Sequence, residues 1–298
     1  MHQFFFIVNP VAGRRANGRT VETILKRMEK SGASYELVYT TGTGSASTLA
    51  RTADAQVVVA VGGDGTVNEV GNGLVGSQKA LGVIPIGSGN DFVKAISVTR
   101  DQAESILLSG KRKRIDVGLI SVTKNGSEKT SRYFLNGVGI GFDAAVANRT
   151  KHIKHLRGTL LYIVAVLQTL GKYEAPSFSV HLDGSALPQM KNLLISIGNG
   201  QCAGGGFYLT PDAMIDDGVL DICMIRDISI GGILRIMPKV MRGKHRSSES
   251  VSFHRARKIA VSADRGFHIH ADGEIVGENV REVEIEVCSA KLNVVVGG

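Results

Sequence analysis

The chain has 298 residues, 43% of them hydrophobic and 21% charged, with a formal net charge of +8. These values are typical of a soluble globular protein of about two domains. The longest apolar stretch, residues 160–167, is far shorter than the roughly 20 residues that span a bilayer, and three widely spaced cysteines argue against a metal knuckle.

The first third of the chain alternates strand and helix patterns. Apolar, β-branched runs predict strands at residues 4–8, 35–39, 57–61 and 81–85, and amphipathic patterns predict helices at 18–31, 45–53, 67–74 and 101–108. This alternation indicates a doubly wound parallel sheet covered by helices, which binds ligands at the carboxyl ends of its strands.

The pattern changes near residue 115. Short strand-like runs follow at 115–122, 132–138, 177–182, 193–198, 219–224, 257–262, 267–271 and 283–288, with helices expected at 158–171 and 230–242. They predict an antiparallel β-sandwich with hairpin turns at 125–126 and 183–184. We therefore expect an α/β domain at 1–114, to which 291–298 return, and a β-rich domain at 115–290.

The most informative motif, Gly-Gly-Asp-Gly-Thr-Val-Asn-Glu at residues 62–69, directly follows the apolar strand at 57–61. Glycines there let a bulky anion approach the main chain, and the start of the next helix offers unpaired N–H groups to it. We expect a nucleotide phosphate site. A tight turn that needs glycine only for its geometry is the alternative.

Several blocks occur in a fixed order: Asn-Pro-Val-Ala-Gly at 9–13, the motif at 62–69, Ile-Pro-Ile-Gly-Ser-Gly-Asn-Asp-Phe at 84–92, the run at 211–221, and Asp-Gly-Glu at 272–274. Together they resemble the soluble lipid kinases related to diacylglycerol kinase, sphingosine kinase and ceramide kinase, above all the small bacterial members. The resemblance covers nearly the whole chain and implies an active site in the cleft between the two domains.

The resemblance also implies the ATP-binding residues. They are Asn9, Pro10, Val11, Ala12, Gly13, Thr40, Gly62, Gly63, Asp64, Gly65, Thr66, Val67, Asn68, Glu69, Ser88 and Asp91. A carboxylate beside a phosphate site needs an intervening cation, so Asp64 argues for Mg²⁺ on the β- and γ-phosphates. Asp91 looks like a second such carboxylate, or the N-cap of the following helix, and the two roles are compatible.

The matching Asp-Gly-Glu block of the family supplies the catalytic carboxylate, which implies Asp272 and Glu274 as a pair. One of the two would act as the base and the other would position the metal or the hydroxyl. The sequence does not assign the two roles to particular residues. A hairpin turn with a solvated glutamate is the alternative. In the bacterial relatives a structural Mg²⁺ lies near the run at 211–221, and its ligands map onto Asp217 and the carbonyls of Met214 and Val219.

The predicted function is therefore transfer of the γ-phosphate of ATP, with Mg²⁺, to a hydroxyl of a diacylglycerol-like lipid. An NAD kinase-like enzyme, or a non-catalytic nucleotide- or lipid-binding protein of the same fold, is the alternative. Basic clusters, among them Lys151, Lys154 and Arg157, attract polyanions or are simply solvated. Low aromatic content disfavours nucleic acid. We expect a cytoplasmic protein bound peripherally to anionic membranes, and an exposed sheet edge could support a homodimer.

Overall fold

The structure, a computed structural model, describes residues 2–12, 17–87, 89–124, 128–150, 152–153, 156, 158–171 and 173–297. The predicted site residues Gly13 and Ser88, the turn at 125–126, and the basic residues Lys151, Lys154 and Arg157 lie outside this part. The chain divides into an N-terminal unit, Met1–Ile115 with Ala290–Gly298, and a C-terminal unit, Asp116–Ser289.

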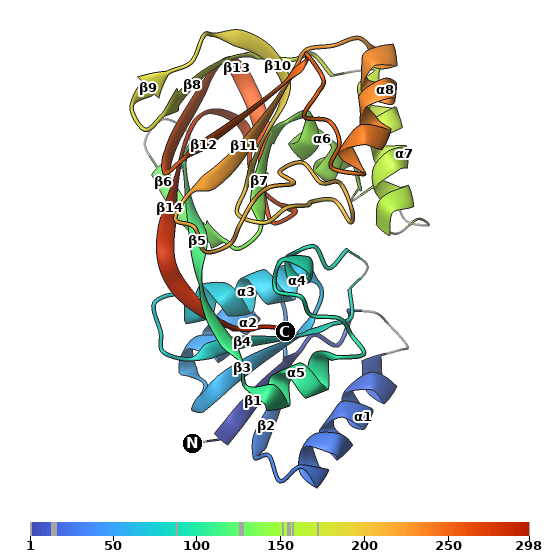
Figure 1. Cartoon of the computed structure of the whole chain (residues 1–298), viewed down its shortest axis with the longest axis vertical. Coiled ribbons are helices and arrows are strands. Elements are labelled where there is room, and N and C mark those ends of the chain that lie inside the picture. The colour runs from blue at the N-terminus through green and yellow to red at the C-terminus, as the bar shows by residue number, and fades with distance from the viewer. Residues whose placement is uncertain are drawn as a thin grey trace. The chain divides into compact units, whose positions relative to one another are not determined.

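The N-terminal unit is a parallel sheet with helices (Figure 1). Its strands are β1 (His2–Val8), β2 (Tyr35–Tyr39), β3 (Ala55–Gly62) and β4 (Ala80–Pro85), in the order β4-β3-β1-β2. The end of β14 (Glu274–Val295) adds to β4 in parallel. The helices are α1 (Asn17–Lys30), α2 (Ser45–Thr52), α3 (Asp64–Leu74), α4 (Phe92–Ala95) and α5 (Ala103–Ser109). The apolar runs of β1, β3 and β4 are buried, as expected for central parallel strands.

The C-terminal unit is an antiparallel β-sandwich in which strands follow the order β12-β11-β10-β7-β13-β14, with β8 beside β13 and β5 beside β14. Its strands are β5 (Arg112–Lys124), β6 (Glu128–Phe134), β7 (Gly137–Gly141), β8 (Ser177–Leu182), β9 (Ser185–Ala186), β10 (Met190–Gly198), β11 (Leu220–Arg226), β12 (Val251–Ala256), β13 (Lys258–Ala271) and β14. A core of buried side chains from these strands fills the sandwich.

Three helices of the C-terminal unit, α6 (Phe142–Thr150), α7 (Gly158–Leu170) and α8 (Ile230–Val240), enclose a second apolar cluster with β10 and β11. In Figure 1, α7 and α8 lie next to each other. No helix in the described ranges is long and apolar enough to cross a bilayer.

The structure corrects several predicted elements. The run at 132–138 belongs to two strands, β6 and β7, because the chain turns at residues 135–136. The runs at 257–262 and 267–271 form one long strand, β13, whose pairing with β14 shifts register between them. Helix α6 was not predicted, since its weakly amphipathic sequence gives little helical periodicity.

Candidate functional site

The loops predicted to bind nucleotide follow four parallel strands of the N-terminal unit. Val8 at the end of β1 pairs with Tyr39 of β2 and with Val61 of β3, and Gly62 pairs with Pro85 of β4. The carboxyl ends of these strands are therefore in line. The loops that begin after them meet at one edge of the sheet, which is where open α/β sheets bind ligands.

Glycine is required where two of these loops touch. A Cβ on Gly87 would lie 2.6 Å from the Cα of Gly63, and one on Gly89 would lie 2.9 Å from Oδ2 of Asp64. Gly63 is the N-cap of α3, whose first turn starts at Asp64. Close packing of the two loops thus leaves main-chain N–H groups at a helix start, an arrangement suited to phosphate.

Asn9 fixes the loop after β1 to the same helix start. Its Nδ2 donates to Oγ1 of Thr66 at 3.0 Å, and its Oδ1 accepts from the N–H of Val11 at 3.1 Å. The side chain of Thr66 is buried. The amide therefore holds the first loop against α3 and explains why an asparagine follows β1.

The acidic side chains of this edge have specific partners. Oδ1 of Asp64 accepts from the N–H of Asp91 at 2.9 Å, which ties the loop after β4 to α3. Oδ1 of Asp91 lies 2.8 Å from Nζ of Lys94, and its side chain makes no capping hydrogen bond to α4. Asp91 thus occupies the N-cap position of α4 without a side-chain capping bond, and its role as a second carboxylate near the phosphates stays a prediction.

Other residues of the predicted ATP set have structural contacts. Oε2 of Glu69 accepts from the N–H of Ala46 at 3.2 Å, so this carboxylate lies at the start of α2. The side chains of Val67 and Asn68 are buried. The N–H of Thr40 donates to the carbonyl of β1 that precedes Asn9.

In the C-terminal unit, Asp272 and Gly273 form the two-residue turn between β13 and β14, with φ values of 48° and 81°. The Asp272 carboxylate accepts three main-chain N–H bonds, from Leu135 at 2.8 Å, Asn136 at 3.0 Å and Gly137 at 2.8 Å. Through these hydrogen bonds, Asp272 holds the turn between β6 and β7 against the β13–β14 hairpin.

Glu274, two residues further on, is held differently. Its Oε2 lies 2.9 Å from Nη1 of Arg132 on β6, and its side chain is 37% exposed. The carboxylate is thus oriented by one cation and open to solvent, whereas Asp272 is engaged by the main chain. The two carboxylates have distinct environments, which the sequence alone did not separate.

A buried polar network lies next to this hairpin. Nδ1 of His270 accepts from the N–H of Gly273 at 3.3 Å, so Nε2 is assigned the proton and donates to Oδ2 of Asp143 at 3.0 Å. The Tyr162 hydroxyl donates to the other oxygen of Asp143. A Cβ on Gly139 would collide with both His270 and Asp143, which explains glycine in β7.

The ionisation of Asp143 reflects these partners. Burial by itself raises the pKa of this carboxyl. The electrostatic interaction with His270, the hydrogen bond from His270 and the hydrogen bond from Tyr162 all lower the pKa. Together they outweigh burial, and the pKa of Asp143 lies below its usual value. Asp143 is therefore a buried carboxylate that stays charged at neutral pH.

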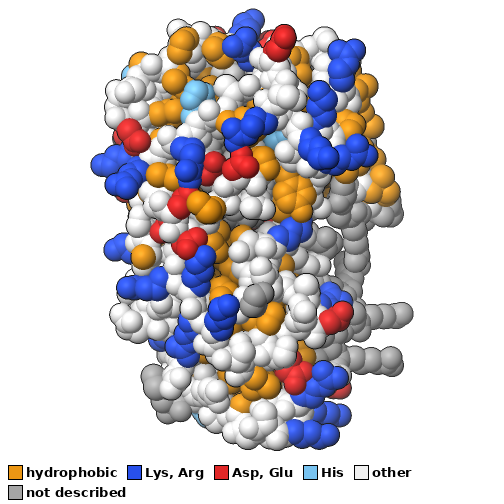
Figure 2. Space-filling model, viewed as in Figure 1, with side chains coloured by type: hydrophobic (Ala, Val, Ile, Leu, Met, Phe, Trp, Pro, Cys, Tyr) orange, Lys and Arg blue, Asp and Glu red, His pale blue; other side chains and the backbone are white. Residues whose placement is uncertain are grey.

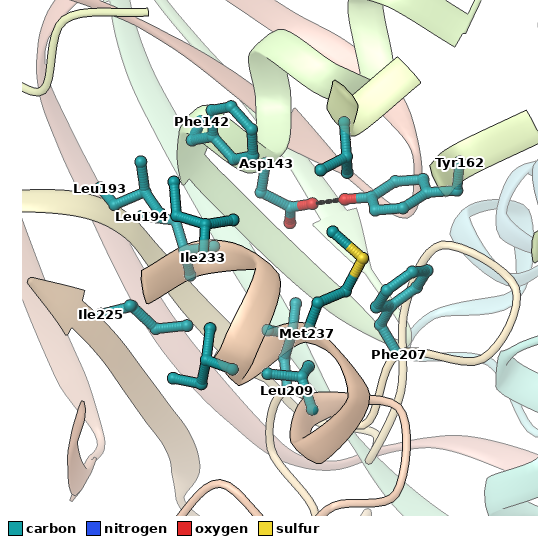
Figure 3. Close-up of a pocket in the computed structure, with 13 residues that line it drawn as sticks. Phe142, Asp143, Tyr162, Leu193, Leu194, Phe207, Leu209, Ile225, Ile233 and Met237 are labelled. Carbon is teal, nitrogen blue, oxygen red and sulfur yellow. Dashed lines mark hydrogen bonds between the residues drawn. The ribbon is translucent and has the colours of Figure 1, made fainter. Parts of the chain in front are cut away.

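Asp143 is at the polar end of an otherwise apolar pocket between α6, α7, α8 and the sheet (Figure 3). The cavity itself is small, about 60 Å³. Apart from Asp143 and Tyr162, its lining is apolar: Phe142, Val166, Leu193, Leu194, Phe207, Leu209, Ile225, Ile233, Ile236, Met237 and Val240. In Figure 3 the Tyr162 hydroxyl points at the Asp143 carboxylate.

A smaller cavity of about 10 Å³ is lined by Asp143, His270 and Asn136, among others. Oδ1 of Asn136 is buried and has no hydrogen-bond partner in the described part of the chain. This oxygen is free to accept a hydrogen bond, and the cavity has room for about one water molecule. The cavity also reaches Gly137, whose N–H bonds to Asp272.

Asp217, the one side chain among the predicted magnesium ligands, is paired with a cation that the chain itself supplies. The Asp217 carboxylate pairs with Arg255, and its Oδ1 accepts from the N–H of Val219 at 3.3 Å. Asp221 is 3.5 Å from Nε of Arg255, and its pKa is raised, chiefly by burial. Met214 is exposed. The oxygen donors suit Mg²⁺ chemically, but Arg255 already neutralises the carboxylate, so the site remains a prediction.

Sequence reasoning missed Arg132, Asp143 and Tyr162. Nothing in the local sequence distinguishes these residues, since their importance comes from contacts with segments more than a hundred residues away, or across helices. His270 offered one signal, because it alternates with Asp272 and Glu274 along the chain.

Comparison with known proteins agrees with this architecture. Residues 3–120 match the diacylglycerol kinase catalytic domain, and residues 136–296 match the YegS C-terminal NAD kinase beta sandwich-like domain. A diacylglycerol kinase from Staphylococcus saprophyticus is 30% identical over 280 residues, covering 91% of this chain and 88% of that protein.

Solved structures show the same fold. A diacylglycerol kinase from Bacillus anthracis superposes with a TM-score of 0.75 at 21% identity, covering 99% of this chain and 97% of that one. Yeast NADH kinase complexed with NADH has a TM-score of 0.58 at 10% identity, covering 100% of this chain and 84% of that one.

The fold is shared with NAD kinases, and the two domain matches together with the diacylglycerol kinase relatives support a kinase of the lipid-kinase class. The family resemblance and fold predicted from the sequence are both confirmed. This chain belongs to the diacylglycerol kinase family.

Proposed function

We propose that this protein transfers the γ-phosphate of ATP to a hydroxyl of a diacylglycerol-like lipid, in a reaction that needs Mg²⁺. The observation that carries the choice of acceptor is the pocket of the C-terminal unit. Among its lining residues only Asp143 and Tyr162 bring polar groups, and the apolar remainder favours contact with the hydrocarbon part of a lipid. A nucleotide acceptor such as NAD would require many more polar partners.

The N-terminal unit would hold ATP at the carboxyl edge of its sheet. The loop at 62–69 and the start of α3 offer N–H donors to the phosphates, and Asn9 keeps the neighbouring loop in place. Asp64 is the candidate carboxylate for the metal. Mg²⁺ bound to the triphosphate neutralises the charge that develops during phosphoryl transfer.

The two carboxylates of the hairpin would have separate roles. Glu274 is solvent-accessible and oriented by Arg132, so it is the better candidate for the base that takes the proton of the acceptor hydroxyl. Asp272, bonded to three N–H groups, would keep the hairpin and the 135–137 turn in position. A carboxylate base typically contributes about 10²–10⁴-fold to the rate.

The test offers labelled ATP and Mg²⁺ to the purified protein with diacylglycerol vesicles, with NAD, and with neither. Label in the lipid phase supports the proposal; label in NADP would assign the NAD kinase-like alternative, and label in neither would favour a non-catalytic protein. Glu274→Gln is the matched variant, and it should bind ATP as the wild type does while losing transfer.

A further inference from the structure

The hairpin between β13 and β14 leads to Glu274 through two residues with positive φ. Asp272 has a φ of 48°, which costs energy for a residue with a side chain, and Gly273 has a φ of 81°. Glycine has the widest choice of φ and ψ, so the turn needs outside contacts to keep one conformation. Asp272 supplies some of them, because it holds the first half of the turn to the N–H groups of residues 135–137.

His270 holds the second half of the turn. Its Nδ1 accepts from the N–H of Gly273 at 3.3 Å, and its side chain is 7% exposed. This bond forms only while Nδ1 carries no proton, because a protonated ring nitrogen is a donor. The tautomer of His270 therefore decides whether the Gly273 amide is restrained.

Asp143 fixes that tautomer from the other side of the ring. Its Oδ2 lies 3.0 Å from Nε2 of His270, and a carboxylate at this nitrogen keeps the proton on Nε2 and leaves Nδ1 as the acceptor. Gly139, the β7 residue opposite His270, makes room for the contact, since a Cβ there would collide with both side chains. The Tyr162 hydroxyl donates to the other oxygen of Asp143.

Burial of these polar side chains carries a free-energy cost. Asp143 is 3% and His270 is 5% exposed, whereas Figure 2 shows other acidic side chains at the surface, among Lys and Arg side chains. Apolar residues of similar volume often stabilise an interior as well as a buried ion pair does, or better. A chain of polar side chains that ends on one N–H group of the hairpin is therefore better explained by the geometry it imposes on the turn than by packing.

We propose that His270 is a positioning residue for Glu274, with Asp143 and Tyr162 fixing the orientation of its ring. The ring restrains the Gly273 amide, and with it the direction in which the chain enters β14 at Glu274. The inference rests on the proposed function, in which Glu274 is the base. Loss of the ring should lower kcat and leave the KM values unchanged, because a misplaced base weakens the transition state and not substrate binding.

Three substitutions at His270 separate positioning from packing. In His270→Asn, Oδ1 is one bond from Cγ, as Nδ1 is in histidine, so it can still accept from Gly273 but no atom reaches Asp143. In His270→Gln, the longer amide reaches Asp143 in place of Nε2 and leaves Gly273 without its acceptor. His270→Leu removes both hydrogen bonds.

The first readout is lipid phosphorylation. We expect His270→Leu and His270→Gln to lower kcat about 10²-fold, as a misplacement of about 1 Å does, with KM values for ATP and lipid within about three-fold of wild type. His270→Asn should recover at least about ten-fold of that loss. It should nevertheless be less stable in urea than His270→Gln, because it leaves the buried Asp143 carboxylate without the ring.

Two results in this assay would overturn the proposal. One is wild-type kcat in His270→Gln. The other is a kcat that follows stability across the three variants, which would reduce the network to packing. His254→Leu is the matched control, because His254 lies on β12, which β11, β10 and β7 separate from β13 in the strand order. It should leave kcat unchanged.

The second readout needs no lipid. Nitrogen-15 spectra of the wild-type His270 ring should show the proton on Nε2, and amide exchange at Gly273 should be at least about ten-fold faster in His270→Gln than in wild type or His270→Asn. A proton on Nδ1 in the wild type, or unchanged exchange in His270→Gln, would contradict the positioning role. Wild-type protein that meets both expectations but phosphorylates no lipid would refute the proposed function alone.

Discussion

The substitutions Asp272→Asn and Glu274→Gln should have different consequences, although the two residues are neighbours in one motif. In Asp272→Asn, the remaining oxygen can still accept from Asn136 and Gly137, but the new NH₂ group faces the N–H of Leu135. One hydrogen bond to a charged acceptor is lost and one donor is left without an acceptor.

Loss of a hydrogen bond to a charged group costs about 1.5–3 kcal/mol, and an unsatisfied donor adds to that cost. We expect Asp272→Asn to lower the free energy of unfolding by about 2–4 kcal/mol. Glu274→Gln removes one half-exposed ion pair with Arg132, which contributes at most about 1 kcal/mol. Its turnover should still fall by about 10²–10⁴-fold.

The assays are urea denaturation and lipid phosphorylation, measured on both variants. Asp183→Asn is the matched control, because Asp183 occupies a similar turn with φ of 51° and accepts from the N–H groups of Arg257 and Lys258, but is exposed. It should change neither quantity appreciably. A free energy of unfolding for Asp272→Asn within about 0.5 kcal/mol of the wild-type value would refute the structural role of Asp272. Wild-type turnover in Glu274→Gln would refute the role of Glu274 as the base.

Two further predictions concern the pocket and the nucleotide edge. Tyr162→Phe removes a hydrogen bond to Asp143 and so raises the depressed pKa of that carboxyl. A depressed pKa stabilises the folded state above the unfolded pKa of about 3.8, and this stabilisation is lost as the pH falls through the folded pKa. Acid unfolding of the variant, monitored by circular dichroism, should therefore begin at a higher pH than in the wild type. Tyr173→Phe is its control, because that hydroxyl is buried without a described partner, and a similar shift there would contradict the explanation. Gly87→Ala should raise the KM for ATP at least about ten-fold by separating two loops, while Gly171→Ala, with open space around it, should not; equal KM values would disprove the close-packing argument.

Local sequence determined the elements of the N-terminal unit. The apolar runs at 4–8, 35–39, 57–61 and 81–85 are strands in the structure because β-branched and aromatic residues suit a buried sheet, and the helices between them enforce parallel pairing. The carboxyl edge, and with it the position of Asn9 and the 62–69 loop, follows from that pairing. Hence the meeting of these loops at one edge of the sheet could be predicted from order and spacing, while phosphate binding there stays a prediction.

Tertiary structure alone decided the roles in the C-terminal unit. Asp272 and Glu274 look alike in the sequence. They differ because main-chain N–H groups of the turn at 135–137 bind Asp272, whereas Arg132 pairs with Glu274. The polar end of the apolar pocket is likewise set by a distant contact, because Asp143 is hydrogen-bonded to His270, 127 residues away along the chain. Such environments arise from contacts between distant segments, whose geometry no local pattern encodes, whereas strand periodicity is a property of neighbouring residues.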